Sequence, residues 1–356
     1  MALLDSLEDF EHRDWDTDPD GQVRMAVVGL GNYGRNVSVP AIEAGDYCTF
    51  TVGVSGTPET RRAVADEYDV RTVDYEAYTE GAATDAYDAV YVATPNRLHL
   101  PHVEAAASHG KAVVCEKPLE VTVDRARRLV EACEAAGVTL MTAYRMQTDP
   151  VVRRLREAVG AGELGTVTRA FGDFSYDVLG GSRGPDQWRL DSRLAGGGAL
   201  MDVGVYPLNT TRYLLDAEPV AVQGETRQSG PVDEVDEHVD FSVRFPGAVG
   251  NFAATLTGRS QASLALDGTA GTVRLCEAFQ PRRERTLVVE TDAGRAVFED
   301  VGRDETREEF DYFAHCLLDR PATRTRRPGR TRGRRDDDGC LRGRPGGRAR
   351  LTPALN

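Results

Sequence analysis

Two patterns of apolar positions divide the chain near residue 150. Before that point, short runs that are apolar throughout alternate with stretches in which apolar residues recur every three or four positions. Continuous runs of this kind are typical of strands buried on both faces of a parallel sheet, and the longer period is that of helices. This part therefore predicts a doubly wound Rossmann sheet. Strands are expected at 23–29, 50–54, 89–94, 112–115 and 138–143, and helices up to 44 and at 58–68, 100–109 and 123–136.

After residue 150 the pattern changes to that of an antiparallel sheet. Helical periodicity is confined to 151–160, 200–215 and 306–318, and strand-like runs separated by short turns fill most of the rest. Such a succession is typical of an open, mostly antiparallel sheet in an α+β domain. We expect the functional site between the two halves, at the carboxyl ends of the parallel strands. The strand-like runs are 165–176, 219–228, 237–245, 248–257, 261–268, 271–276 and 285–290.

These patterns divide the chain into four segments. Residues 1–22 form an acidic arm, 23–145 a dinucleotide-binding domain and 146–320 a domain for substrate binding and oligomerisation. Residues 321–356 contain eleven arginines without apolar periodicity. A nucleic-acid-binding tail and a disordered segment are possible interpretations. Our preferred hypothesis is a change of reading frame, because the composition switches abruptly at one point.

Composition limits the class of protein further. The net charge is −14, and the chain has only two lysines among its 43 basic residues, as is typical of proteins from salt-loving organisms. This charge argues against nucleic acid as a partner. Neither a membrane span nor a basic signal peptide is recognisable. The six cysteines lack paired spacing, which argues against disulfides and a metal site and favours a cytoplasmic protein.

A glycine motif follows the first predicted strand and opens a predicted helix. In this context G-x-G-x-x-G indicates a dinucleotide-binding loop. Its first glycine allows a tight turn, its second allows close approach of a pyrophosphate, and its third allows close packing of helix and strand. The phosphates would lie at the helix N-terminus. The motif is Gly29-Leu30-Gly31-Asn32-Tyr33-Gly34.

The end of the second strand favours NADP over NAD. An NAD enzyme would place an acidic residue there, whereas this chain has Ser55, Gly56 and Thr57. A small hydroxyl residue with arginine nearby suits a ribose 2′-phosphate. Arg61 is the main candidate for this arginine, with Arg62 and Arg35 as alternatives, and NAD remains possible.

Polar residues also follow the third and fourth long strands. Thr94 and Asn96 are expected near the nicotinamide half of the cofactor, although Pro95 is also compatible with a simple turn. His99 and His102 lie three residues apart without an evident third ligand, so we interpret them as structural or adjacent to the cofactor.

Lys117, in Cys115-Glu116-Lys117-Pro118, is one of the two lysines and ends an apolar strand. An ammonium group can shift its pKa or exchange a proton, which a guanidinium cannot do. Asp202 and Tyr206 lie four residues apart on a predicted helix and would share one of its faces. Taken singly, a surface lysine, a helix-terminal charge and a core aromatic are the simpler interpretations; together with the glycine motif the three residues indicate catalysis.

Four stretches resemble the family of glucose–fructose oxidoreductase, inositol dehydrogenase and their relatives. They are the glycine motif, residues 93–96, Glu116-Lys117-Pro118, and residues 196–207, which include Asp202 and Tyr206. The resemblance covers roughly 23–320 and the combination is specific to the family. Within the family, segments at 88–92, 143–148, 186–191 and 308–313 resemble haloarchaeal D-xylose dehydrogenases. The family usually ends in a further helix, and arginine-rich sequence replaces that helix here.

The resemblance implies hydride transfer from the anomeric carbon of an aldopyranose, with D-xylose the first candidate, to NADP⁺, giving a lactone. It implies that Tyr206 is the general base, that Lys117 stabilises the phenolate and contacts the ribose, and that Asp202 positions the substrate or the lysine. It also implies that the Lys117–Pro118 bond is often cis. Tyr144 and Arg145 end the last parallel strand and are candidates for binding sugar hydroxyls, and Trp188 and Arg189 are candidates for a loop that covers the cofactor. Aromatic–arginine pairs of this kind also occur as surface packing. Asp173 and Tyr176 are weaker candidates.

The expected contacts can be stated residue by residue. Cofactor contacts are expected from Gly29, Leu30, Gly31, Asn32, Tyr33, Gly34, Ser55, Gly56, Arg61, Thr94, Pro95, Asn96, His99, Glu116, Lys117, Trp188 and Arg189. Substrate contacts are expected from Lys117, Arg145, Tyr176, Asp202 and Tyr206.

Two alternatives to this function remain open. The chain could be a related dehydrogenase for glucose, inositol, a sugar phosphate or a dihydrodiol, or a regulator that binds NADP(H) without turnover. Self-association through the open sheet predicts a homodimer or homotetramer, and the sequence does not decide between them.

Overall fold

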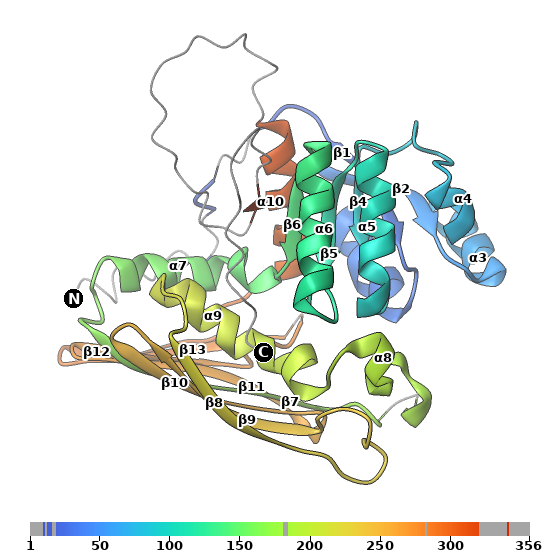
Figure 1. Cartoon of the computed structure of the whole chain (residues 1–356). Coiled ribbons are helices and arrows are strands. Elements are labelled where there is room, and N and C mark those ends of the chain that lie inside the picture. Colours follow the sequence, from blue (N-terminus) through green and yellow to red (C-terminus); the bar gives the residue numbers. More distant parts are fainter. Residues whose placement is uncertain are drawn as a thin grey trace.

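Two β-sheets, with helices between and around them, form the structure (Figure 1). It is a computed structural model that describes residues 10, 13–15, 19–180, 184–281, 283–319 and 340–341. Most of the acidic arm and of the arginine-rich segment therefore lie outside the described residues. The combination of a parallel Rossmann sheet with a mostly antiparallel open sheet confirms the predicted fold class.

The first sheet is a parallel Rossmann sheet with one short antiparallel strand at its edge. The order is β15-β6-β5-β4-β1-β2-β3, so the direction of strand addition reverses between β1 and β4. In open α/β sheets, ligands bind at such a reversal, beyond the carboxyl ends of the strands. The strands are β1 (Val23–Val28), β2 (Cys48–Val54), β3 (Arg71–Val73), β4 (Ala89–Val92), β5 (Ala112–Glu116), β6 (Leu140–Ala143) and β15 (Cys340–Leu341).

Each face of this sheet has its own apolar core, because successive strand residues point to opposite sides. On β1, Met25 and Val27 face one core, whereas Ala26 and Val28 face the other. Helices α5 and α6 cover one face, and α2 and α10 cover the other. The helices of this part are α2 (Val39–Glu43), α3 (Pro58–Tyr68), α4 (Tyr75–Thr79), α5 (His99–Ser108), α6 (Val123–Ala136) and α10 (Glu305–Leu318).

Helix α10 comes late in the chain but packs against the sheet formed by the first half. Phe310 and Phe313 are fully buried against the first sheet, although the helix follows the last strand of the second sheet. The sequence placed this helix in the segment 146–320, and its packing shows that part of that segment completes the core of the nucleotide-binding half. The proposed division of the chain into domains remains a prediction, with this helix shared between the halves.

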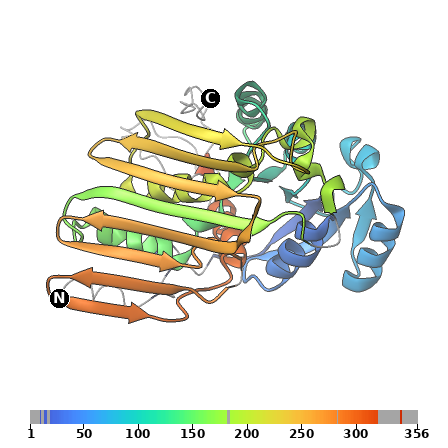
Figure 2. The same ribbon diagram turned by 90° about the horizontal axis from the view of Figure 1, so that it is seen from below.

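The second sheet has one covered face and one open face. Strand β7 pairs in parallel with β10, and all other neighbours are antiparallel. Helices α7 and α9 pack on the face nearer the first sheet, and the opposite face is uncovered in Figure 2. The order is β14-β13-β12-β11-β7-β10-β9-β8. The elements are α7 (Pro150–Gly160), β7 (Val167–Asp177), α8 (Ser192–Ala195), α9 (Val205–Leu215), β8 (Ala221–Arg227), β9 (His238–Phe245), β10 (Ala248–Thr255), β11 (Thr257–Gly268), β12 (Gly271–Cys276), β13 (Thr286–Thr291) and β14 (Gly294–Phe298).

Two predicted α-helices begin instead as π-helical turns. The helix after the glycine motif starts with the turn Gly34–Ser38, and the helix with Asp202 starts with the turn Leu200–Gly204. A π-helical turn pairs residues five apart, and such turns are frequent at functional sites. Apolar periodicity over so short a stretch does not distinguish the two helix types.

Strands β3 and β14 were not predicted from the sequence. Strand β3 has three residues, and none of the five residues of β14 is buried. Neither strand therefore has the run of buried apolar residues from which strands are predicted.

Within the described residues, no helix is long and apolar enough to cross a membrane. The same residues contain no group of three or more His, Cys, Asp or Glu side chains suited to holding a metal ion.

Candidate active site

The glycine loop follows β1 at the reversal point of the first sheet. Gly29 has φ +103°, and a Cβ there would lie 2.8 Å from the backbone of Ala93. A Cβ on Gly34 would lie 2.2 Å from the carbonyl oxygen of Gly29. By contrast, no described atom lies within 4 Å of a Cβ placed on Gly31. The first and third glycines are thus required by packing, whereas the second leaves space in which a pyrophosphate fits.

At the end of β2, Arg61 is the arginine that turns toward the strand terminus. Its Nη1 donates a hydrogen bond of 2.6 Å to the carbonyl oxygen of Ser55. Arg62 pairs with Glu59, and Arg35 pairs with Glu67. Of the three arginines suggested by the sequence, Arg61 therefore lies nearest to Ser55.

The end of β4 is connected to both neighbouring segments. The ring nitrogens of His99 lie 2.9 Å from the carbonyl oxygen of Thr94 and 3.2 Å from that of Leu119. Burial lowers the pKa of His99 although these carbonyls oppose the shift, which keeps the ring neutral. Asn96 donates to the carbonyl oxygen of Ala195 at the end of α8. The hydroxyl of Thr94 is buried and has no hydrogen-bond partner among the described residues, so it is a donor available to a bound group.

The residues around Lys117 come from both halves of the molecule. Lys117 follows β5, and the Lys117–Pro118 peptide bond is cis. Its Nζ donates to the backbone carbonyl oxygen of Asp202 at 2.7 Å and lies 3.4 Å from the Oδ1 of the same residue. The same Nζ lies 4.9 Å from the centroid of the Tyr206 ring. The structure thus brings together the three residues that the sequence selected.

A π-helical turn lies at this contact. The N–H of Val205 bonds to the carbonyl oxygen of Leu200, so the backbone here departs from a regular α-helix. The carbonyl oxygen of Asp202, within the turn, accepts the hydrogen bond from Lys117. Asp202 and Tyr206 still reach the same ammonium group, although they do not lie on a single regular α-helix as predicted.

Asp202 is the centre of a hydrogen-bonded and ionic network. Tyr176 of β7 donates its hydroxyl to Oδ2 of Asp202, and the Nε of Arg189 lies 3.4 Å from the same oxygen. Burial raises the pKa of Asp202, but Arg189, Lys117 and Tyr176 outweigh burial and leave it below its ordinary value. The pKa of Tyr176 is raised by burial and by the adjacent carboxylate. The network therefore holds an ionised aspartate beside a neutral phenol.

Lys117 remains charged in this environment. Burial lowers its pKa, whereas Tyr206, Asp202 and Glu116 raise it, and the net shift is upward. Glu116 is itself held by the hydroxyl of Tyr91, which donates to Oε1 at 2.5 Å. The ammonium group is therefore a fixed positive charge next to the Tyr206 ring.

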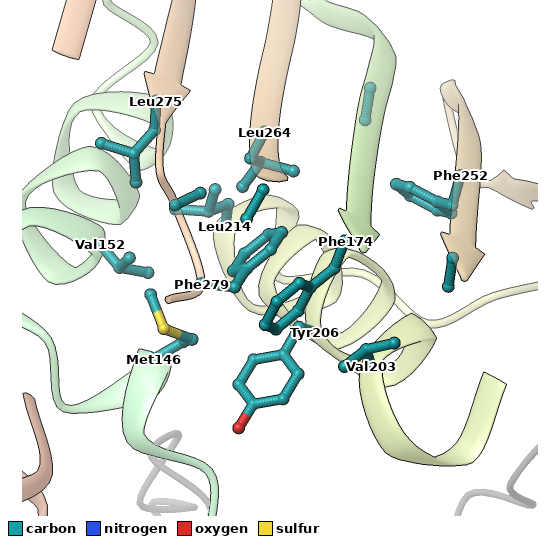
Figure 3. Packing of buried hydrophobic residues seen from close by; sticks show 14 of the residues in the cluster. Met146, Val152, Phe174, Val203, Tyr206, Leu214, Phe252, Leu264, Leu275 and Phe279 are labelled. Carbon is teal, nitrogen blue, oxygen red and sulfur yellow. The ribbon is translucent and has the colours of Figure 1, made fainter. Parts of the chain in front are cut away.

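Tyr206 is packed among aromatic rings, and its hydroxyl points away from them. Figure 3 shows Phe174 and Phe279 on one side of the ring and the phenol oxygen directed away from this cluster. The ring also lies 5.5 Å from that of Tyr144, whose hydroxyl donates to the backbone carbonyl oxygen of Tyr206 at 2.6 Å. The surrounding rings fix the direction of the phenol.

Two other predicted residues have polar groups that bond within the protein, and the second of them lies away from the site. The donors of Arg145 bond to Glu305 and to the carbonyl oxygen of Phe279, and its guanidinium lies 5.0 Å from the Tyr206 ring centroid. Asp173 lies on the opposite face of β7 from Phe174 and accepts hydrogen bonds from Gln261 and Ser263. The contact of Arg145 with Glu305 was not predicted, because the two residues are 160 positions apart and no local pattern connects them.

Trp188 and Arg189 form a short turn beside Asp202. The turn Trp188–Leu190 stacks the Arg189 guanidinium 4.5 Å from the Trp188 ring centroid. The ion pair of Arg189 with Asp202 connects this segment to the site. The distances place both residues at the edge of the cluster around Lys117.

A dinucleotide-type glycine loop facing a lysine, an aspartate and a tyrosine defines an oxidoreductase of the two-domain Rossmann class. Residues 23–144 match the oxidoreductase family with an NAD-binding Rossmann fold, and residues 152–274 match the GFO/IDH/MocA C-terminal domain. The chain belongs to the Gfo/Idh/MocA family of oxidoreductases, as its motifs suggested.

Named relatives are similar over most of their length. The chain is 44% identical to a D-xylose 1-dehydrogenase [NADP(+)] of Haloarcula marismortui over 87% of this chain and 88% of the relative. It is 32% identical to D-xylose 1-dehydrogenase (NADP(+)) 2 of Haloferax volcanii over 82% of this chain and 88% of the relative. Among solved structures, aldose-aldose oxidoreductase from Caulobacter crescentus, complexed with glycerol, is 31% identical with a TM-score of 0.78, covering 83% of this chain and 90% of that one.

Proposed function

We propose that the chain is an NADP-dependent sugar dehydrogenase that oxidises the anomeric carbon of an aldopyranose, D-xylose being the first candidate, to a lactone. The observation that carries this proposal is the Lys117 ammonium, which bonds to Asp202 and lies 4.9 Å from the Tyr206 ring. A charged cluster at the edge of a dinucleotide-binding sheet is suited to take the hydroxyl proton of a sugar while the sugar loses a hydride to the cofactor. The two haloarchaeal relatives named as D-xylose dehydrogenases support the substrate class.

Tyr206 is proposed as the general base. Its phenolate accepts the proton of the anomeric hydroxyl as the C–O bond becomes a carbonyl, while the electron pair of the anomeric C–H bond leaves as hydride. NADP⁺, when bound, supplies the hydride acceptor. An ordinary phenol is a weak base near neutrality, so the proposal needs a group that stabilises its anion.

Lys117 supplies that stabilisation in the proposed mechanism. Its raised pKa keeps it charged at neutral pH, and a positive charge near the ring favours the phenolate over the phenol. Asp202 holds the ammonium through its backbone and side-chain oxygens, while Tyr176 and Arg189 hold Asp202. Asp202 thus positions the lysine, one of the two roles considered from the sequence.

The residues at the end of β2 fit NADP. Ser55, Gly56 and Thr57 offer no carboxylate to a ribose, and Arg61 lies beside Ser55. Together with the free space at Gly31 and the unpaired hydroxyl of Thr94, this arrangement would hold the ribose phosphate, the pyrophosphate and the nicotinamide end in that order along the sheet edge.

The proposal is tested by NADP⁺ reduction with the purified protein in molar KCl. D-xylose, D-glucose, L-arabinose and myo-inositol form the first panel, and NAD⁺ is the comparison for the cofactor. We expect reduction of NADP⁺ with D-xylose well above the other compounds. A second panel contains a sugar phosphate and a dihydrodiol. Turnover confined to inositol or to a compound of the second panel would replace D-xylose as the proposed substrate, and NADPH binding without turnover of any compound would favour the regulator.

The open face of the second sheet is proposed to form a homodimer or homotetramer. Phe171 of β7, Val249 of β10 and Val297 of β14 are exposed at 37%, 41% and 44%. The strand register places all three on the face opposite α7 and α9 (Figure 2). Sedimentation of the protein against its Phe171→Asp variant tests this interface, and an unchanged mass would exclude it.

A further inference from the structure

Arg145 contacts the candidate base on one side and a buried charge cluster on the other. It is 4% exposed and lies directly after Tyr144, at the end of the sheet that carries Lys117. Its guanidinium carbon is 5.0 Å from the centroid of the Tyr206 ring. Two cations, Lys117 and Arg145, therefore contact the same phenol ring at nearly equal distances.

The hydrogen-bond donors of Arg145 are used inside the protein. One terminal nitrogen donates to Glu305 of α10, and the other donates to the backbone carbonyl oxygen of Phe279. The Nε of Arg145 is also buried and has no hydrogen-bond partner among the described residues. The contact with sugar hydroxyls expected from the sequence remains a prediction, and the contacts of Arg145 in the structure are with protein groups.

The cluster behind Arg145 fixes its position. Glu305 also lies 3.2 Å from Nη2 of Arg285, and Arg285 pairs with Asp149 at the start of α7. All four side chains are nearly inaccessible to solvent. With Arg145 included, their two positive and two negative charges balance, so Arg145 is held against the ring as a member of a cluster with no net charge.

We propose that Arg145 is a positioning residue for Tyr206, whose guanidinium, held by Glu305 and the Phe279 carbonyl, fixes the ring and stabilises the negative charge that the ring acquires. The inference rests on the proposed role of Tyr206 as the base. A cation over an aromatic face is attracted by the ring even when the ring is neutral, and the attraction increases when the ring becomes an anion. Because guanidinium does not lose its proton, this charge stays constant through the reaction, whereas an ammonium can exchange one.

The electrostatic surroundings agree with this role. Burial lowers the pKa of Arg145, but Tyr206 and Glu305 outweigh burial and leave it above its ordinary value. Charged and titratable groups reach Tyr206 from the glycine loop, from the ends of β5 and β6, from β7 and from the π-helical turn. These groups are Tyr33, Lys117, Tyr144, Arg145, Tyr176 and Asp202.

The test follows the ionisation of Tyr206 directly, without substrate. The protein is labelled with [ζ-¹³C]tyrosine, and the resonance of Tyr206 is assigned by its loss in Tyr206→Phe. We expect Arg145→Met to move the titration midpoint of this resonance upward by about one pH unit or more. Arg145→Lys, which retains the charge, should restore most of the native midpoint. Glu305→Gln should lower the midpoint, because the positive charge of Arg145 is then no longer neutralised by Glu305.

Arg285→Met is the matched control, since Arg285 belongs to the same cluster and is even less exposed. It should lower thermal stability about as much as Arg145→Met and move the Tyr206 midpoint much less. A midpoint shift no larger in Arg145→Met than in Arg285→Met, or shifts of the same sign in Arg145→Met and Glu305→Gln, would overturn the proposal.

Kinetics provide a second readout. With the sugar that the native protein oxidises, Arg145→Met should lower kcat about tenfold at neutral pH, leave KM for the sugar nearly unchanged, and approach native kcat in alkaline solution. A large rise in KM with kcat unchanged would instead show that Arg145 binds substrate. If the native protein oxidises no sugar, the proposed function fails, while the resonance titration still decides the role of Arg145.

Discussion

The ring and the hydroxyl of Tyr206 have different surroundings. The ring packs against Phe174, Phe279 and Tyr144, and these contacts depend on shape and not on the oxygen. The hydroxyl points away from them (Figure 3), and the Nζ of Lys117 lies 4.9 Å from the ring centroid. Removal of the oxygen therefore tests the chemistry with little effect on packing.

We predict that Tyr206→Phe lowers kcat by about 10²- to 10⁴-fold, the usual range for loss of a general base. NADP⁺ binding, measured by calorimetry, should be unchanged, because the glycine loop does not contact the hydroxyl in the proposed mechanism. The free energy of unfolding should change by less than about 1 kcal/mol, since the ring contacts remain. Native turnover in this variant would exclude Tyr206 as the base.

At the residue scale, the sequence located Lys117, Asp202 and Tyr206 because each lies in a local motif, and the structure brings them together. It did not locate Glu305, because a partner supplied by a distant helix leaves no local signal. The polar candidates Arg145 and Asp173 were selected by residue type and by position near a strand end. In the structure both side chains bond to protein groups that are distant in the chain, and no local sequence pattern predicts such partners.

At the scale of elements, the glycines of the loop have two different structural roles. The first and third glycines are needed because a side chain would collide with neighbouring backbone, whereas the second has open space around it. The motif was recognisable in the sequence because its spacing is fixed by this geometry.

Two alanine variants in the loop should separate the effect on cofactor binding from the effect on stability. We predict that Gly31→Ala leaves the melting temperature unchanged and weakens NADP⁺ binding tenfold or more, because its methyl group occupies the space proposed for the pyrophosphate. Gly34→Ala should instead lower the free energy of unfolding by about 2–4 kcal/mol, because its Cβ would lie 2.2 Å from the Gly29 carbonyl. Equal effects of the two variants on stability would contradict this assignment. Calorimetric unfolding and NADP⁺ titration measure both quantities.

Helix α10 carries a second buried carboxyl group, that of Glu309. One of its oxygens has no hydrogen-bond partner among the described residues. Burial, followed by repulsion from Glu116, raises the pKa of Glu309 well above its ordinary value. The folded protein therefore holds this group neutral at a pH at which the unfolded chain ionises it, and stability is lost as the pH rises above the unfolded value of about 4.3.

We predict that Glu309→Gln removes this loss of stability at higher pH. At pH 8 the variant should be more stable than the native protein by about 1 kcal/mol or more, and near pH 4 the two should be equal, because both states then carry the proton. Denaturant unfolding at the two pH values measures the difference. A variant that is less stable at pH 8 would show that Glu309 is ionised and paired in the folded protein.

The long helices and strands followed from periodicity, and the helices Pro58–Tyr68 and Val123–Ala136 have the predicted bounds. The placement of α10 did not follow, because an amphipathic pattern indicates that one face is buried without indicating the surface that covers it. The π-helical turn at Leu200–Gly204 also escaped prediction, and it contains Asp202, whose carbonyl oxygen accepts the hydrogen bond from Lys117.

At the scale of the whole molecule, the candidate site exists only because the two sheets face each other. The first sheet supplies the glycine loop and Lys117, and the second supplies Tyr176 and the turn that leads into α9. The first sheet alone would hold a dinucleotide, and the second alone would hold the base. In the proposed mechanism, their junction permits hydride and proton to leave neighbouring atoms of one sugar.

Transfer of deuterium from D-[1-²H]xylose to NADP⁺ is the most direct measurement of this claim. We predict that the NADPH formed is heavier by about one mass unit, because the hydrogen on the anomeric carbon is the one transferred. Mass spectrometry of the reduced cofactor reads this result. Unlabelled NADPH formed from the labelled sugar would show oxidation at another carbon and would contradict the account.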